Sequence, residues 1–171
     1  MKVQLDAGKR PLEIADEIEG MFGLVARTHK FAETYFQYTR HKTLVHDRSV
    51  PEVYVRIGPP GAGKTKWMDD TYGIGNWVTA PCNNGYWFDG CDHDVILFDY
   101  VEANAIPSSS LFKRLTDRYP IQVSVKGGFI TWKPRVIVFT SNSHPKQWWG
   151  NLRAYDLGVI ERRLTNVEVV V

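Results

Sequence analysis

The sequence is poor in cysteine: only Cys82 and Cys91 occur in 171 residues. Two cysteines are too few for a disulfide framework, which fits a protein that stays in a reducing compartment. Together with His93 they match no common spacing of zinc ligands, and a fourth ligand is missing. The sequence therefore predicts neither a disulfide scaffold nor a zinc site.

An excess of charge of one sign is also missing. The chain has 21 Lys and Arg against 19 Asp and Glu, a net charge of +2. This balance excludes nucleic-acid binding through positive charge spread over the whole chain, so any basic surface must be local. The sequence shows no apolar run long enough to span a bilayer and no signal peptide, so no membrane partner is expected.

The residues that are present divide the chain into two parts of different character. Residues 1–50 predict helices, because apolar residues recur near a 3.6-residue period from Pro11 to a stop at Gly20 or Gly23. A second helix is expected over residues 28–40, with an aromatic stripe that we interpret as packing. That stripe consists of Phe31, Tyr35, Phe36 and Tyr38. A polar connector follows and predicts a domain boundary after residue 50.

Residues 51–171 change to short buried strands that alternate with helices. Strands are expected over 53–57, 94–99 and 135–142, and a serine-capped helix is expected over 108–119. Two alternating runs around Gly127-Gly128 predict a β-hairpin over 121–133. This alternation of strands and helices indicates an α/β layer architecture.

A phosphate-binding loop follows the first of these strands. The segment GPPGAGKT fits the pattern G-x-x-x-x-G-K-[ST], and a strand before it and a helix after it are the expected context. Glycines let backbone N–H groups reach phosphate oxygens, the lysine supplies a positive charge, and the threonine offers a hydroxyl to Mg²⁺. The alternative is a simple turn between two elements. The predicted residues for ATP are Gly58, Pro59, Pro60, Gly61, Ala62, Gly63, Lys64, Thr65 and Lys66.

Polar residues end the two later buried strands. Asp99 comes 34 residues after Thr65 (99 − 65), where a carboxylate can hold Mg²⁺ through water. An acid often follows directly, but Tyr100 stands there, so Glu102 is the candidate base, with a solvated surface glutamate as the alternative. Asn142 can sense the γ-phosphate or the attacking water, although an asparagine alone is more often a turn former.

Two basic features remain open on the residues alone. The hairpin carries Lys126 at its tip and Trp132 and Lys133 on its return strand, which could follow phosphates and stack bases or form an ordinary surface hairpin. Arg162 and Arg163 could enter a neighbouring subunit's site or act as salt-bridge partners.

Taken in order, these motifs resemble the superfamily 3 helicase part of replication initiator (Rep) proteins from circular single-stranded DNA viruses, those of circovirus type especially. The resemblance covers residues 51–171, and residues 1–50 resemble, more weakly, the helical oligomerisation segment before that ATPase. The segments that carry it are GPPGAGKTKW, WFDG, VILFDY, LTDRYP, VKGG, VIVFTSN and ERRLT.

The resemblance implies an AAA+-like P-loop ATPase that forms a ring of six subunits around single-stranded DNA in the host nucleus, with ATP and Mg²⁺ between subunits. It makes residues 58–65 Walker A and Asp99 Walker B. It places Lys126, Gly127 and Gly128 in a DNA-contacting loop, makes Asn142 the sensor, and makes Arg162 or Arg163 an arginine finger.

Two departures accompany the resemblance. Tyr100 replaces the second acid, and the His-hydrophobic-His motif of the upstream nicking endonuclease does not occur, so the chain is expected to be a fragment or a product that lacks nicking. The function predicted is an ATP-driven helicase of rolling-circle replication. The alternatives are a small P-loop kinase and an ATP-binding assembly module with weak hydrolysis.

Overall fold

The computed structural model describes residues 1–81, 87–102, 108–150 and 152–171. The chain forms two compact units, Met1–Asp47 and Arg48–Val171. The sequence placed a boundary after residue 50, within the polar connector. No helix in the described ranges is long and apolar enough to span a bilayer.

The first unit consists of three helices, α1 (Lys2–Asp6), α2 (Pro11–Glu17) and α3 (Phe22–Leu44). Helix α2 starts at Pro11 as predicted, and its first free amide, Arg10 N–H, donates to Glu13 Oε2 at 2.8 Å. Helix α3 is longer than predicted. The core of this unit is formed by Leu5, Ile14, Val25, Ala32 and Phe36.

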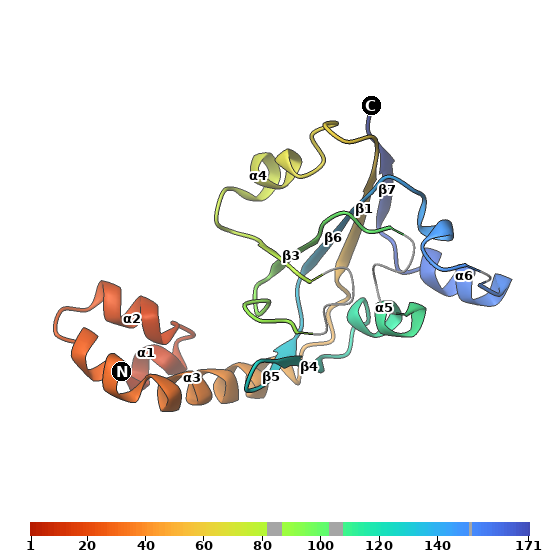
Figure 1. The fold of residues 1–171 in the computed structure, drawn as a ribbon. Coiled ribbons are helices and arrows are strands. Elements are labelled where there is room, and N and C mark those ends of the chain that lie inside the picture. The colour runs from red at the N-terminus through yellow and green to blue at the C-terminus, as the bar shows by residue number, and fades with distance from the viewer. Residues whose placement is uncertain (82–86, 103–107, 151) are drawn as a thin grey trace. The chain divides into compact units, whose positions relative to one another are not determined.

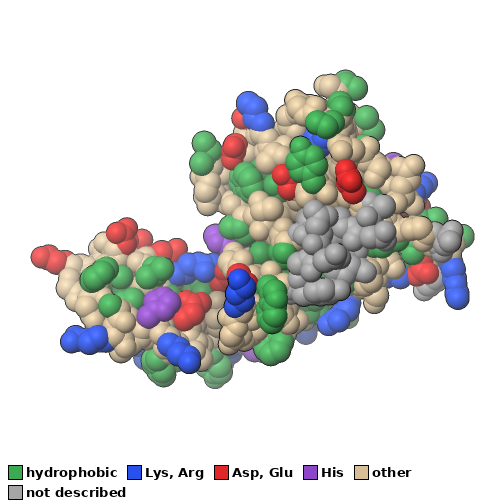
Figure 2. Space-filling view, in the orientation of Figure 1, with side chains coloured by type: hydrophobic (Ala, Val, Ile, Leu, Met, Phe, Trp, Pro, Cys, Tyr) green, Lys and Arg blue, Asp and Glu red, His purple; other side chains and the backbone are tan. Residues whose placement is uncertain are grey.

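The aromatic stripe of α3 is only partly explained by packing. Phe36 is buried, but Phe31 and Tyr38 are 67% and 60% exposed. Leu12 and Phe22 are exposed as well. Figure 2 shows hydrophobic side chains at the surface of this unit among acidic and basic groups. Packing within this unit therefore does not account for all of its aromatic residues.

The second unit contains a parallel five-stranded sheet in the order β2-β3-β6-β1-β7. The strands are β1 (Glu52–Ile57), β2 (Val78–Thr79), β3 (Val95–Phe98), β6 (Val136–Ser141) and β7 (Asn166–Val169). Every residue of β3 and β6 is buried, as expected for strands covered on both faces. The predicted α/β architecture is confirmed, although β2 and β7 were not predicted.

Alternate residues of the central strands enter different cores on the two faces of the sheet. On one face, Leu97 and Val138 pack with Met68 of α4 (Lys66–Tyr72). On the other face, Phe98 and Phe139 pack in one cluster with residues of α5 (Ser109–Leu115) and α6 (Ala154–Glu161). Figure 1 shows α4 on one side of the sheet and α5 and α6 on the other.

The remaining elements of this unit are a hairpin and one short turn of helix. Strands β4 (Ile121–Val125) and β5 (Gly128–Trp132) pair antiparallel and form the predicted hairpin. The 3₁₀ turn Pro145–Gln147 precedes the buried Trp148. The hairpin contributes Trp132 to the same core as α5.

Parallel pairing brings the polar strand ends together. Ile57, the last residue of β1, pairs with Ser141 of β6, and Phe98, the last residue of β3, pairs with Phe139. The segments that follow these strands therefore leave the sheet at one edge, where open α/β sheets place their ligands.

Candidate functional site

The loop of residues 58–65 leaves β1 at this edge and turns sharply. Gly61 and Gly63 have φ values of 84° and 72°, which side chains with a Cβ rarely adopt. Gly58 lies against the end of the sheet, and a Cβ built on it would be 2.3 Å from the carbonyl oxygen of Val170. Glycine is thus required at these positions by backbone conformation or by close approach.

Lys64 is the positive charge of this loop, and it is buried. Its Nζ donates to Gly58 O at 2.5 Å, Pro59 O at 2.9 Å and Asn142 Oδ1 at 3.4 Å. No carboxylate in the described part of the chain forms an ion pair with it. A buried cation without a counter-charge is unfavourable, so the site suits a bound anion such as phosphate.

Two oxygen ligands for a metal ion meet beside Lys64. Thr65 Oγ1 donates to Asp99 Oδ1 at 3.3 Å. Hydroxyl and carboxylate oxygens suit Mg²⁺, which proteins usually bind with one or two carboxylates plus phosphates and water. Within the described ranges, no three His, Cys, Asp or Glu side chains gather as a metal cage. The pair therefore fits Mg²⁺ that arrives with a nucleotide.

Glu102 reaches this site through an unusual turn. Tyr100 has φ 55° and is half exposed, so it offers no carboxylate. Two residues later, Glu102 Oε1 accepts a hydrogen bond from Asn142 Nδ2 at 3.3 Å. Because Asn142 Oδ1 also contacts Lys64, Asn142 joins the candidate base to the loop lysine.

Thr140 is a site residue that the sequence did not indicate. It is fully buried on β6, and its Oγ1 donates to Asp99 Oδ1 at 2.5 Å. The same oxygen accepts from Tyr100 N–H at 2.9 Å. A threonine inside a β strand usually reads as a strand former, so no sequence signal marks it.

The sequence did not predict a zinc site from Cys82, Cys91 and His93, and Cys82 lies outside the described residues. Burial raises the pKa of the Cys91 thiol to about 11, so this thiol stays protonated near neutral pH.

The hairpin tip carries the three predicted residues Lys126, Gly127 and Gly128, and Phe129, which was not predicted, follows them. Lys126 is exposed and its backbone N–H donates to Asp89 Oδ1 at 2.9 Å, while Gly127 takes φ 89° in the turn. Phe129, on the strand that leaves the tip, is 64% exposed. The tip therefore carries an exposed lysine and, three residues later, an exposed aromatic ring.

Trp132 and Lys133 are not at this surface, contrary to the prediction. Trp132 is 2% exposed, and its Nε1 donates to Leu115 O at 2.8 Å. Lys133 is 7% exposed, and its Nζ donates to Ser49 O at 2.5 Å and Arg118 O at 2.9 Å. The indole fills the core and the ammonium ties backbone segments together, so neither can contact DNA in this fold.

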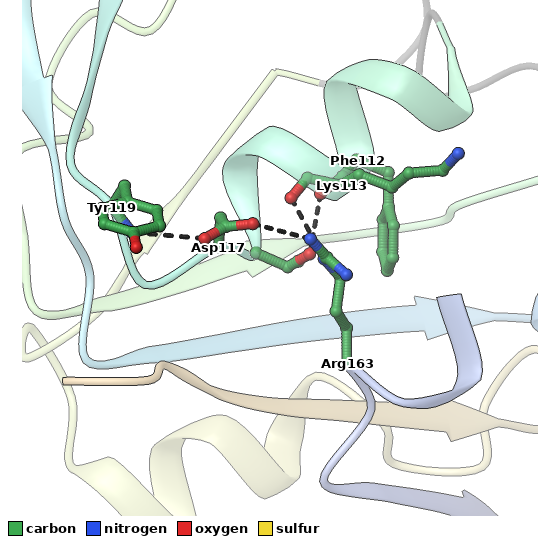
Figure 3. Close-up of polar contacts among 6 residues, drawn as sticks. Phe112, Lys113, Asp117, Tyr119 and Arg163 are labelled. Atoms are coloured by element: carbon green, nitrogen blue, oxygen red, sulfur yellow. Dashed lines mark hydrogen bonds and ion pairs between the residues drawn. The ribbon is translucent and has the colours of Figure 1, made fainter. Parts of the chain in front are cut away.

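The two terminal arginines have different environments. Arg163 forms an ion pair of 2.6 Å with Asp117, and its Nε donates to Lys113 O at 3.2 Å (Figure 3). Arg162 is exposed, and its Nε donates only to Gly158 O of its own helix in the part of the chain described. Arg162 is therefore free to meet another molecule, whereas Arg163 is held within the subunit.

No family model matches this chain, but several curated proteins are similar to it in sequence. The replication-associated protein of pigeon circovirus is 39% identical over 132 residues, which are 72% of this chain and 39% of that protein. The porcine circovirus 2 protein is 32% identical over 67% of this chain and 36% of its own length. The canary circovirus protein is 30% identical over 92% of this chain and 50% of its own length.

Solved structures show more distant similarity. An inhibitor-bound JCV helicase matches all of this chain and 45% of its own, with a TM-score of 0.48 and 12% identity. The S. cerevisiae Hsp104–ADP complex matches 96% of this chain and 30% of its own, also at 0.48 and 12%. The chain spans half or less of the length of the curated relatives it matches. It is a homologue of the circovirus replication-associated proteins.

Proposed function

We propose that this chain is the ATP-hydrolysing helicase part of a viral replication initiator and uses ATP to move along single-stranded DNA. The observation that carries the proposal is the buried Lys64, which lacks a carboxylate partner among the described residues and lies with Asp99 and Asn142 at one sheet edge. An anion site beside a metal-binding carboxylate is what nucleotide hydrolysis requires. Similarity to circovirus replication-associated proteins supports the viral role.

The roles of the site residues follow from their contacts. Lys64 would face the phosphates, and Thr65 with Asp99 would hold Mg²⁺, which when bound offsets negative charge on the phosphate oxygens. Asn142 would orient Glu102, which would accept the proton of the attacking water.

The DNA contact is proposed at the hairpin tip, where Lys126 and Phe129 are exposed. Phosphate contacts by a lysine and base stacking on an aromatic ring need no particular sequence, so binding should be non-specific. The proposal includes a ring of six subunits, assembled through the helical unit Met1–Asp47, that acts in the host nucleus.

The test is ATP hydrolysis by the purified chain with and without single-stranded DNA. We expect turnover that rises several-fold with DNA and disappears in Lys64→Ala, whereas Lys30→Ala, which removes an exposed lysine of the helical unit, should behave as wild type. An ATP hydrolysis rate that does not change when DNA is added would favour a small kinase. ATP binding with normal assembly but no turnover would favour an assembly module.

The hairpin tip should determine DNA affinity. Phe129→Ala and Lys126→Ala are each expected to weaken binding of a fluorescent oligothymidylate about tenfold, because stacking and phosphate contacts are lost. ATP affinity should stay unchanged. Tyr119→Ala, which removes another exposed ring just before β4, is the matched control. Wild-type DNA affinity in Phe129→Ala and Lys126→Ala, as in the control, would place the DNA site elsewhere.

A further inference from the structure

Thr140 forms hydrogen bonds with two consecutive residues of the turn that follows β3, Asp99 and Tyr100. Its side chain is completely buried, and its single hydroxyl proton goes to Asp99 Oδ1 at 2.5 Å. The hydroxyl oxygen accepts from the Tyr100 N–H at 2.9 Å. The one hydroxyl group thus donates a hydrogen bond to Asp99 and accepts one from Tyr100, the next residue in the chain.

The turn that this hydroxyl holds is conformationally unfavourable. Tyr100 is the only non-glycine residue in the described ranges with positive φ, at 55°, a region that aromatic residues rarely adopt. Such a conformation persists only where surrounding contacts enforce it.

Neighbouring bonds hold the next residue in the same way. Val101 N–H donates to Thr140 O at 2.7 Å, and Ser141 Oγ donates to Val101 O at 2.5 Å. Val101 itself is buried. The chain is therefore bound to the end of β6 for two residues and then presents Glu102 to Asn142.

The same bond also orients the carboxylate. Asp99 Oδ1 accepts from both Thr140 and Thr65. In the part of the chain that the structure describes, Asp99 Oδ2 accepts no hydrogen bond, so this second oxygen stays available to a metal-bound water.

We propose that Thr140 is a positioning residue whose buried hydroxyl orients Asp99 for Mg²⁺ and, through the left-handed turn at Tyr100, places Glu102 beside Asn142. The inference rests on the proposed nucleotide site and deepens it. It would also explain how hydrolysis can proceed with a tyrosine where an acid is expected: the candidate base is Glu102, two residues further along, and the turn at Tyr100 brings it to Asn142.

The experiment compares Thr140→Val, which keeps the branched shape without the hydroxyl, with Thr140→Ser, which keeps the hydroxyl. The readout is the Mg²⁺ concentration at which binding of a fluorescent, slowly hydrolysed ATP analogue is half-maximal. Thr140→Val should raise it about tenfold or more, as losses of outer-shell partners do. Thr140→Ser should stay near wild type. Analogue binding without Mg²⁺ should be equal in all proteins.

Thr116→Val is the matched control, because Thr116 is also buried and its hydroxyl bonds only to Phe112 O in the described part of the chain. It should leave the Mg²⁺ dependence unchanged. A second variant, Thr140→Val with Tyr100→Gly, tests the turn, since glycine adopts positive φ freely. Thr140→Val should also lower ATP turnover, because Glu102 is no longer held beside Asn142. The Thr140→Val, Tyr100→Gly double variant should recover part of that turnover, and no recovery would contradict the role of the turn.

The possible failures can be told apart. An unchanged Mg²⁺ dependence in Thr140→Val, with Mg²⁺-dependent binding in the wild type, would overturn the positioning role and leave the nucleotide site intact. A wild-type chain that binds no nucleotide analogue at any Mg²⁺ concentration would overturn both. A Thr140→Ser protein as impaired as Thr140→Val would assign the effect to packing, against the proposal.

Discussion

Replacing Glu102 by glutamine is expected to lower ATP turnover by about 10²- to 10⁴-fold, the usual contribution of a general base. Glu102 Oε1 lies 3.3 Å from Asn142 Nδ2, and Asn142 Oδ1 lies 3.4 Å from Lys64 Nζ. The carboxylate is thus linked to the group that would face the γ-phosphate. Glutamine keeps the size and the acceptor oxygen but cannot take a proton, so ATP affinity should remain close to wild type.

The measurement is single-turnover hydrolysis alongside equilibrium ATP binding. Glu52→Gln is the matched control, because Glu52 begins β1, at the end of that strand opposite to the loop that carries Lys64. It should hydrolyse ATP at the wild-type rate. Near-normal turnover in Glu102→Gln would show that another residue accepts the proton, and parallel loss of binding would make Glu102 a binding residue instead.

The centre of this fold and site was predictable because the signals are local and parallel pairing is regular. Strand β3 is a continuous apolar run that Asp99 follows directly, and β6 begins with the apolar run VIVF and is followed by Asn142. Since parallel strands align their carboxyl ends, Lys64, Asp99 and Asn142 had to converge once the sheet formed. The loop glycines follow from phosphate chemistry alone.

The hairpin was predicted as an element but its faces were not. Alternation places Ile130 and Trp132 on one face and Phe129 on the other, yet it does not say which face meets the core. Trp132 lies in the core because α5 and Phe88 pack against the face of the hairpin that carries it. The aromatic residue left for solvent is Phe129.

Strand β7 and the role of Thr140 depend on partners distant in sequence. Strand β7 is four residues long and mostly exposed, and it exists because β1 offers it an edge. Thr140 resembles any other threonine of a strand until Asp99, 41 residues earlier, lies against its hydroxyl. Long-range contacts of this kind have no counterpart in local sequence.

The two terminal arginines should have different roles, Arg162 in ATP turnover and Arg163 in stability. Arg162→Ala is expected to lower ATP turnover by about 10³-fold, the lower end of what an arginine finger supplies, because Arg162 is exposed and free to reach a neighbouring subunit. Arg163→Ala should instead lower the unfolding temperature, since it breaks the ion pair with Asp117, which lies just after the end of α5. Arg162→Lys should recover little, because lysine cannot donate a planar pair of hydrogen bonds.

Mixing variants tests whether Arg162 acts across subunits. Arg162→Ala keeps an intact loop lysine, and Lys64→Ala keeps an intact arginine, so a mixed assembly contains interfaces that have both groups. Mixing equal amounts of the two variants should restore turnover to well above that of either variant alone. Mixing either of them with a chain that carries both Lys64→Ala and Arg162→Ala should restore none. Each site would then be completed by the next copy of the chain. Absence of any recovery in assembled mixtures would place the arginine's action within its own subunit, and full turnover in Arg162→Ala would remove it from the site.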